Sequence, residues 1–163
     1  MNNKMVWLLV LLVTGNLALT AYVALRPAAV GAAATAAAGE SVISESKAND
    51  LAKDFVALYN KKDPVALYAK LDNLARVQIS QEQLAQQIQK LHSVLGDVTN
   101  YAYVNSELAG TTDGKAFYNA NYKVALSGAT FAHGTMKLTF VKNSDGFGLV
   151  GLFINGADSG LGH

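Results

Sequence analysis

The chain has 163 residues, of which 51% are hydrophobic, and its formal net charge is +1. Three of its 13 basic and two of its 12 acidic residues lie at or before Lys47, which leaves ten of each in the body. A neutral body lacks the basic surface that neutralises phosphates, so nucleic-acid binding is not expected. The chain contains no cysteine, which excludes disulfide frameworks, thiolate zinc sites, thiol nucleophiles and lipid-modified cysteines.

Residues 1–26 contain an uncharged stretch, Met5–Leu25, that predicts a transmembrane helix. At a rise of 1.5 Å per residue this stretch reaches about 30 Å, enough to cross a bilayer core. A cleaved signal peptide is the alternative, because small residues suited to a peptidase follow at 30–32 and 36–38. Either interpretation places the body outside the cytoplasm. It would be tethered to the cytoplasmic membrane or, after cleavage, periplasmic or secreted.

Residues 27–46 are rich in alanine, glycine and serine, a composition typical of a flexible spacer. We expect the spacer to hold a single domain, residues 47–156, away from the membrane. Residues 157–163 form a flexible tail.

The first part of the domain has a helical pattern. Residues 46–63 carry an apolar stripe at helical spacing, with Ser46 as the expected cap. Asp63 and Pro64 then predict the cap and first turn of a short second helix. Ser80 and Gln83 match a capping box at the start of a third helix, which we expect Gly96 to end in the left-handed conformation.

After Gly96 the apolar spacing changes to two, which predicts strands. Turn residues separate four of them, at 98–108, 115–126, 130–142 and 146–155. Three helices followed by an antiparallel meander indicate an α+β fold with the helices on one face of the sheet.

The middle hairpin has a register that its pattern predicts. Tyr118, Tyr122 and their alternate neighbours share a face with Met136, Leu138 and Phe140 only if the loop has an odd length. We expect the loop Ser127-Gly128-Ala129, with Gly128 or a neighbour at positive φ. The opposite face then carries polar residues.

Three phrases of the chain resemble the nuclear transport factor 2-like superfamily, and in particular its exported bacterial domains. They are LGDV at 95–98, TTDGKAFY at 111–118 and SDGFGLVGLFIN at 144–155. The resemblance covers about residues 48–155 and implies a curved, cone-shaped sheet covered by helices. Members of the superfamily include enzymes, ligand-binding proteins and membrane-tethered parts of envelope assemblies, and they often pair through the sheet.

No catalytic or metal-binding set is evident. His92, on the third helix, is expected at the surface or its boundary, and His133 is expected on the polar sheet face with no carboxylate opposite to orient it. His163 lies in the terminal tail. Because the three histidines lie on a helix, a strand and a tail, they lack the paired spacing of metal ligands, and neither a metal nor a cofactor is expected. Asp72 and Asp97 do not have the buried positions that an isomerase-like carboxylate needs.

Two sets of residues are candidates for binding. The first is a tyrosine cluster at the mouth of the cone, for which a core-edge role is the alternative: Tyr59, Tyr68, Tyr118 and Tyr122. The second is the polar sheet face, for which a plain solvated surface is the alternative: Asn119, Asn121, Lys123, Phe131, His133, Thr135 and Lys137.

These patterns favour a non-enzymatic binding or scaffold module of the bacterial cell envelope, facing the periplasm or the exterior. Its partners would be the membrane, through the N-terminal helix, and a second copy or another envelope protein, through the sheet face. The alternative is a small-molecule isomerase, lyase or hydrolase that uses the pocket of the cone.

Overall fold

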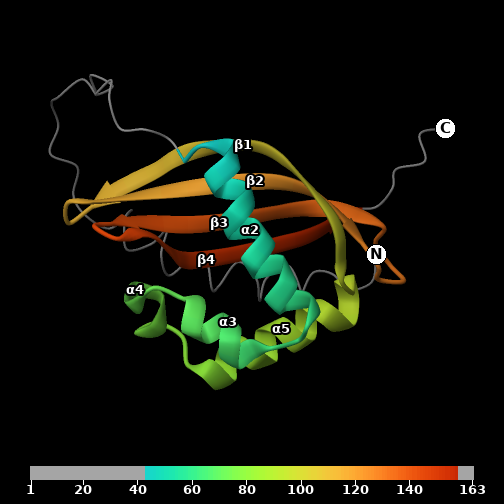
Figure 1. The fold of residues 1–163 in the computed structure, drawn as a ribbon. Coiled ribbons are helices and arrows are strands. Elements are labelled where there is room, and N and C mark those ends of the chain that lie inside the picture. The colour runs from blue at the N-terminus through green and yellow to red at the C-terminus, as the bar shows by residue number, and fades with distance from the viewer. Residues whose placement is uncertain (1–42, 158–163) are drawn as a thin grey trace, which may run out of the picture. The chain divides into compact units, whose positions relative to one another are not determined.

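The computed structural model describes residues 43–157 (Figure 1). The predicted anchor or signal segment, residues 1–26, lies outside the described residues, as do most of the predicted spacer and tail. No helix within residues 43–157 is both long enough and apolar enough to cross a bilayer.

Within residues 43–157, four helices precede the sheet: α2 (Glu45–Asn60), α3 (Pro64–Lys70), α4 (Asn73–Arg76) and α5 (Gln81–Leu95). The caps predicted at Asp63 and at the Ser80 capping box are confirmed. The cap predicted at Ser46 is wrong, because the Ser44 hydroxyl accepts the hydrogen bond from the Lys47 amide at 3.3 Å. Ser46 lies inside the first turn, since the helix begins one residue before it.

The single turn of α4 was not among the three predicted helices. The Asp72 carboxylate caps it by accepting from the Leu74 amide at 2.9 Å. The Asp72 amide in turn donates to the Leu149 carbonyl at 2.7 Å, and Leu71 forms a parallel bridge with Leu149. The segment before α4 therefore lies along the outer edge of the last strand.

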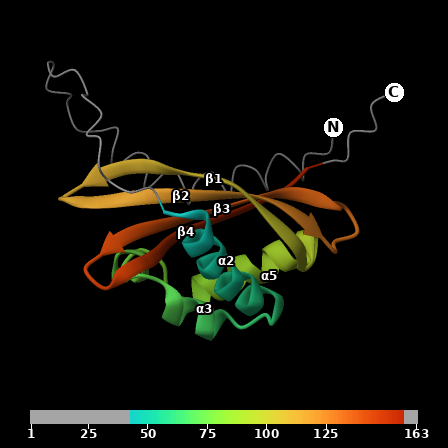
Figure 2. The same cartoon turned by 45° about the horizontal axis from the view of Figure 1, so that its top comes forward.

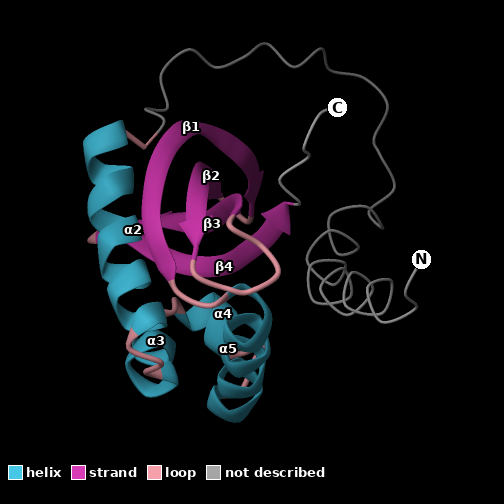
Figure 3. Cartoon of the chain, turned by 90° about the vertical axis from the view of Figure 1, so that its right-hand side faces the viewer, coloured by secondary structure: helices cyan, strands magenta, loops and turns pink. Residues whose placement is uncertain are grey.

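The sheet contains four antiparallel strands in sequence order, as predicted: β1 (Val98–Thr112), β2 (Lys115–Leu126), β3 (His133–Asn143) and β4 (Gly146–Ala157). Register shifts interrupt β1 at three places, next to Asn100, Asn105 and Gly110. Because each irregularity increases local twist, the long first strand bends strongly, as Figure 3 shows.

The shared face and the odd loop length predicted for the β2–β3 hairpin are confirmed, but the loop Ser127-Gly128-Ala129 is wrong, because the loop extends to Phe131. Tyr118 pairs with Phe140 and Tyr122 with Met136, so both apolar sets share one face. The Leu126 amide donates to the Ala132 carbonyl at 2.9 Å, which closes a loop of odd length over residues 127–131.

Gly128 is not at positive φ, so that part of the hairpin prediction is wrong, and the need for glycine there is steric. A Cβ on Gly128 would lie 2.6 Å from the Leu95 carbonyl carbon and oxygen. Gly96 ends α5 at φ 69° and ψ −152°, which shares the positive φ of the left-handed conformation but not its ψ. A Cβ on Gly96 would lie 2.6 Å from the Gly128 nitrogen, so the two glycines let the end of α5 touch the loop.

All four helices lie on one side of the sheet (Figure 2). One apolar core lies between the helices and the strands. Four of its side chains fill the space where a ligand pocket of the cone would lie, and each is at most 4% exposed: Phe55, Tyr122, Leu138 and Phe140. Within residues 43–157, no helix covers the other side of the sheet, so any contact surface there consists of strand side chains.

Candidate functional site

The four tyrosines that the sequence places at a ligand site do not gather at one opening. Tyr59, Tyr118 and Tyr122 are buried in the core, with at most 1% of their surface exposed, and Tyr68 on α3 is half-buried. The Tyr118 ring packs edge-on against Phe147 at 5.9 Å between centroids. Ligand binding by these tyrosines stays a prediction, and in the structure they contribute to packing.

Tyr122 joins the sheet to α2. Its hydroxyl donates to the Ala48 carbonyl of α2 at 2.8 Å. Burial raises the pKa of Tyr122, and the neighbouring hydroxyls of Tyr103 and Tyr101 raise it further. The hydroxyl therefore remains a neutral donor at physiological pH, which is the form that this buried hydrogen bond requires.

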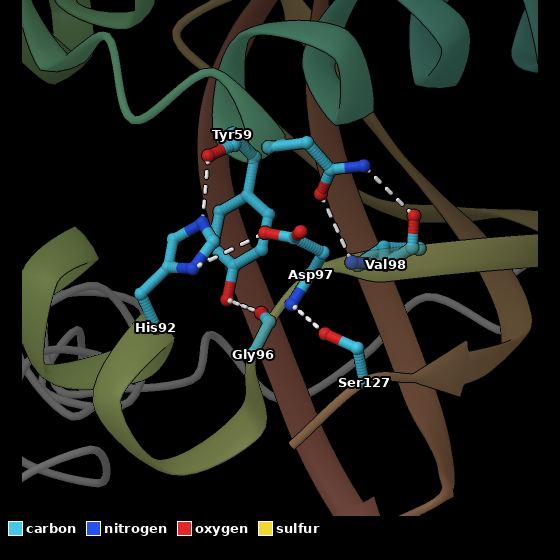
Figure 4. A network of polar contacts seen from close by, with 7 residues as sticks. Tyr59, His92, Gly96, Asp97, Val98 and Ser127 are labelled. Atoms are coloured by element: carbon cyan, nitrogen blue, oxygen red, sulfur yellow. Dashed lines mark hydrogen bonds and ion pairs between the residues drawn. The ribbon is translucent and has the colours of Figure 1, made fainter.

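A second cluster joins the ends of α2 and α5 to the start of β1 (Figure 4). The Tyr59 hydroxyl donates to the Gly96 carbonyl at 3.1 Å. Burial, and then the charge of Asp97, raise the pKa of Tyr59 from 10.0 to about 12. The His92 ring stacks on the Tyr59 ring at 4.3 Å between centroids, with 19° between the planes.

His92 lies at the boundary of the core, within the surface or boundary position that the sequence predicts: the residue is half-buried, with its side chain 8% exposed. Its Nε2 lies 2.8 Å from the Tyr59 carbonyl oxygen, and because a carbonyl only accepts, Nε2 is the donor. Its Nδ1 lies 3.5 Å from an Asp97 carboxylate oxygen. The sequence does contain a signal for this burial, since His92 follows buried Ile88 by four residues on the same helix face.

Both ring nitrogens of His92 thus face atoms of the protein itself. A general base needs a ring nitrogen within reach of the proton that it abstracts from a substrate. The cluster around His92 therefore fits a role in holding α2, α5 and β1 together better than a role in proton transfer.

The side of the sheet without helices carries a ladder of polar side chains. Asn121 donates to Asn105 at 2.9 Å between side-chain amides. The Thr139 hydroxyl donates to the Asn119 side-chain oxygen at 2.9 Å, and the Asn119 amide donates to Glu107 at 3.4 Å. These contacts cross from β1 to β3, so the polar side chains hold one another in fixed positions.

Beside the ladder, a trough of about 370 Å³ crosses all four strands. The side chains of Tyr122 and Met136 are buried on the helix side, so only the main chain of these residues can form the floor. The walls are the side chains of Val104, Asn121, Lys123, Thr135, Lys137 and Phe153. Val104 is 52% exposed, and the Lys137 ammonium lies 5.9 Å from the centre of the Phe153 ring.

The predicted partner face agrees with this surface except at one residue. Lys123 pairs with Thr135 and Asn121 with Lys137, while His133 is exposed at the end of the same face. Val104 and Phe153 complete the trough but were not predicted. Their place beside the other wall residues depends on how β1 pairs with β2 and how β4 pairs with β3.

Phe131 is that exception. Gly156 pairs with Gly134, and Gly134 pairs with Val124, whose side chain is buried in the core. A Cβ on Gly156 would therefore point to the core side, and it would meet the Phe131 ring there. Phe131 therefore packs on the side with the helices. It precedes the first residue of β3, so the alternation of the strand does not reach it.

A second, open cleft of about 600 Å³ lies at the end of the sheet beside α4. Lys115 and Lys142 line it together with Asp72 and Asp145, so its charges balance. Both Asp72 oxygens are already used, one by the α4 cap and the other by the Asn143 amide at 2.8 Å.

Metal ligands do not gather in the described part of the chain. Within residues 43–157, no group of three or more histidine, aspartate or glutamate side chains is placed to hold a metal ion.

Neither a protein-family model nor a curated protein sequence matches the chain. Several solved structures are similar to it, and two of them are bacterial proteins. One is a candidate aromatic ring hydroxylase from Novosphingobium aromaticivorans, with 10% identity over 66% of this chain and 85% of that protein, at a TM-score of 0.41. The other is a nuclear transport factor 2-like superfamily protein from Salmonella enterica, with 12% identity over 71% of this chain and 94% of that protein, at 0.38.

Proposed function

We propose that this protein is a non-enzymatic binding or scaffold module of the bacterial cell envelope. Its N-terminal segment tethers it to the membrane, and its α+β domain faces the periplasm or the exterior. The domain contacts its partner through the side of the sheet that has no helices. The observation that carries the proposal is the trough, where exposed Val104 and half-buried Phe153 lie beside ordered polar groups.

The trough has the mixture of groups that is typical of a contact surface. Val104 and Phe153 supply apolar area, which gains free energy when a partner removes it from water. Asn121 is already oriented by its hydrogen bond with Asn105, so little side-chain entropy is lost when it meets a partner.

The packed interior supports binding over enzymatic use of the cone. An isomerase, lyase or hydrolase of this shape would need a pocket between helices and sheet with a buried ionisable group. Phe55, Tyr122, Leu138 and Phe140 occupy that region, and no charged side chain is buried among residues 43–157.

The membrane tether is supported by the sequence. Met5–Leu25 is long enough to cross a bilayer and has no charge, and the alanine-rich segment after it provides reach. Intact-mass analysis of the protein from its native host tests this part. A mature N-terminus near Ala33 or Gly39 would contradict a retained tether while leaving export in place.

A photocrosslinking residue at Thr135 tests the contact surface in intact cells. Thr135 is exposed in the trough, and Lys53, exposed on α2, is the matched control. We expect a discrete crosslinked product from position 135 and none from position 53. Equal products from both positions, or none from either, would contradict the proposed contact.

A further inference from the structure

The trough differs in charge from the rest of the domain. The four strands contain four lysines but only one acidic residue, Glu107. Two of these lysines, Lys123 on β2 and Lys137 on β3, line the trough, and no carboxylate lines it. Glu107 lies next to Asn119, whose amide donates to it. A domain that is neutral in total therefore presents a local positive charge on this face.

The two lysines lie across neighbouring strands. Lys123 pairs with Thr135 and Lys137 pairs with Asn121, so the lysines are diagonal neighbours on one face. Lys137 also lies over the Phe153 ring, which keeps its ammonium beside the apolar wall instead of pointing away from it. Charge and apolar area are thus adjacent within one trough.

This charge distribution disfavours a second copy of the chain as the occupant. In a symmetric dimer centred on the trough, Lys123 and Lys137 would approach the same lysines of the other copy. Like charges brought together in an interface cost free energy unless acidic groups intervene, and Glu107 is the one acidic group in the strands.

We propose that the trough binds an acidic peptide segment of another protein, in which glutamates or aspartates flank an apolar side chain. The carboxylates pair with Lys123 and Lys137, and the apolar side chain enters between Val104 and Phe153. The Asn121 and Thr135 side chains are placed to bond with its main chain. This inference rests on the proposed function, because it names the partner class of the same surface.

The probe is a short fluorescent peptide with glutamates on both sides of a central phenylalanine, and fluorescence anisotropy measures its binding to the full-length protein in mild detergent. One matched peptide has lysines in place of the glutamates, and another has glycine in place of the phenylalanine. The test variant is Lys123→Glu with Lys137→Glu. The control variant is Lys115→Glu with Lys142→Glu, which makes the same charge change at exposed residues outside the trough.

We expect the acidic peptide to bind the wild type more tightly than either matched peptide. The test variant should weaken this binding at least about tenfold, because two attractive pairs become repulsive, and should favour the lysine peptide instead. The control variant should bind like the wild type. The reversed preference keeps the test decisive, since a variant that failed to fold would bind neither peptide.

Equal weakening by the control variant would overturn the inference, because binding would then follow net charge alone. Absence of acidic-peptide binding to the wild type would overturn it as well. The proposed function would survive either result if crosslinking at Thr135 persisted. A wild-type dimer that the test variant dissociates would also overturn the inference, with a second copy as the partner.

Discussion

Asn60 and Val98 exchange two hydrogen bonds, although 38 residues separate them. The Asn60 side-chain amide donates to the Val98 carbonyl at 2.9 Å, and its side-chain oxygen accepts from the Val98 amide at 2.9 Å. The last residue of α2 thus pairs with the first residue of β1 as a strand would. The main-chain amide and the carbonyl of Val98 thus both have a hydrogen-bond partner where the strand begins.

Replacement of Asn60 by alanine should destabilise the domain. It leaves the amide and carbonyl of buried Val98 without these partners, at a cost of about 1–3 kcal/mol. Urea unfolding followed by circular dichroism measures the change. Ser93→Ala, which removes an exposed hydrogen bond to Lys90, is the control and should change stability by less than about 0.5 kcal/mol. An Asn60→Ala variant as stable as the control would contradict the role given to this pair.

His92 should tolerate only residues that can donate a hydrogen bond at the position of Nε2. His92→Phe keeps the ring over Tyr59 but removes one of the two donors to the Tyr59 carbonyl, which still accepts from the Lys62 amide at 3.0 Å, so the loss should be about 0.5–1.5 kcal/mol. His92→Gln retains a donor and should recover part of that loss. Thermal unfolding of both variants checks the order, and equal stability of the phenylalanine variant and the wild type would contradict it.

Stability should fall in alkali through the two buried tyrosines. Between about pH 10 and about pH 12, Tyr59 ionises in the unfolded chain but stays protonated in the folded one. The unfolded state therefore binds fewer protons, and stability declines by about 1.4 kcal/mol per pH unit for each such group. Burial raises the pKa of Tyr122 in the same direction.

Chemical unfolding at a series of pH values from 8 to 12 would measure this decline. Tyr59→Phe should be less stable at neutral pH, because it lacks the hydrogen bond to Gly96, yet its stability should depend less on pH above about 10. The same slope in this variant and in the wild type would show that other groups cause the decline.

Two glycines should respond differently to alanine. Gly128→Ala places a methyl group 2.6 Å from the Leu95 carbonyl, and the helix end must move, at a cost of about 1–3 kcal/mol. Gly114→Ala meets no atom within 4 Å and is strained only by its φ of 74°, at a cost of about 1 kcal/mol. Midpoints of urea unfolding compare them, and a smaller loss for Gly128→Ala would contradict the close approach.

Most of the fold can be predicted from the sequence because helix caps and the two-residue alternation of strands each depend on residues close together in the chain. The Ser80 capping box and the two-residue alternation of β2 and β3 depend on neighbours in the chain, and both are confirmed. Ser46 fails as a cap because two serines lie close together and the pattern cannot rank them. Phe131 fails because loop residues follow no period.

The candidate site is less accessible to sequence analysis. Lys123, Thr135 and Lys137 follow from strand alternation, but Val104 lies within the register shift between Tyr103 and Asn105, outside the regular pairing of β1. Phe153 joins the trough only because it pairs with Lys137 across β3 and β4. The contact of His92 with Tyr59 links residues 33 positions apart, and helix spacing shows only that His92 shares a face with buried residues.

The three register shifts of β1 also affect how copies of the chain meet one another at high concentration. β1 is an edge of the sheet, and an edge strand with regular spacing is a template on which further strands add to form fibrils. The shifts break the ladder of free amides and carbonyls into short pieces, so an extended strand from another copy can match only a few residues at once. At the other edge, Leu71 and Asp72 already occupy part of β4. Both edges of the sheet are therefore poor templates for strand addition.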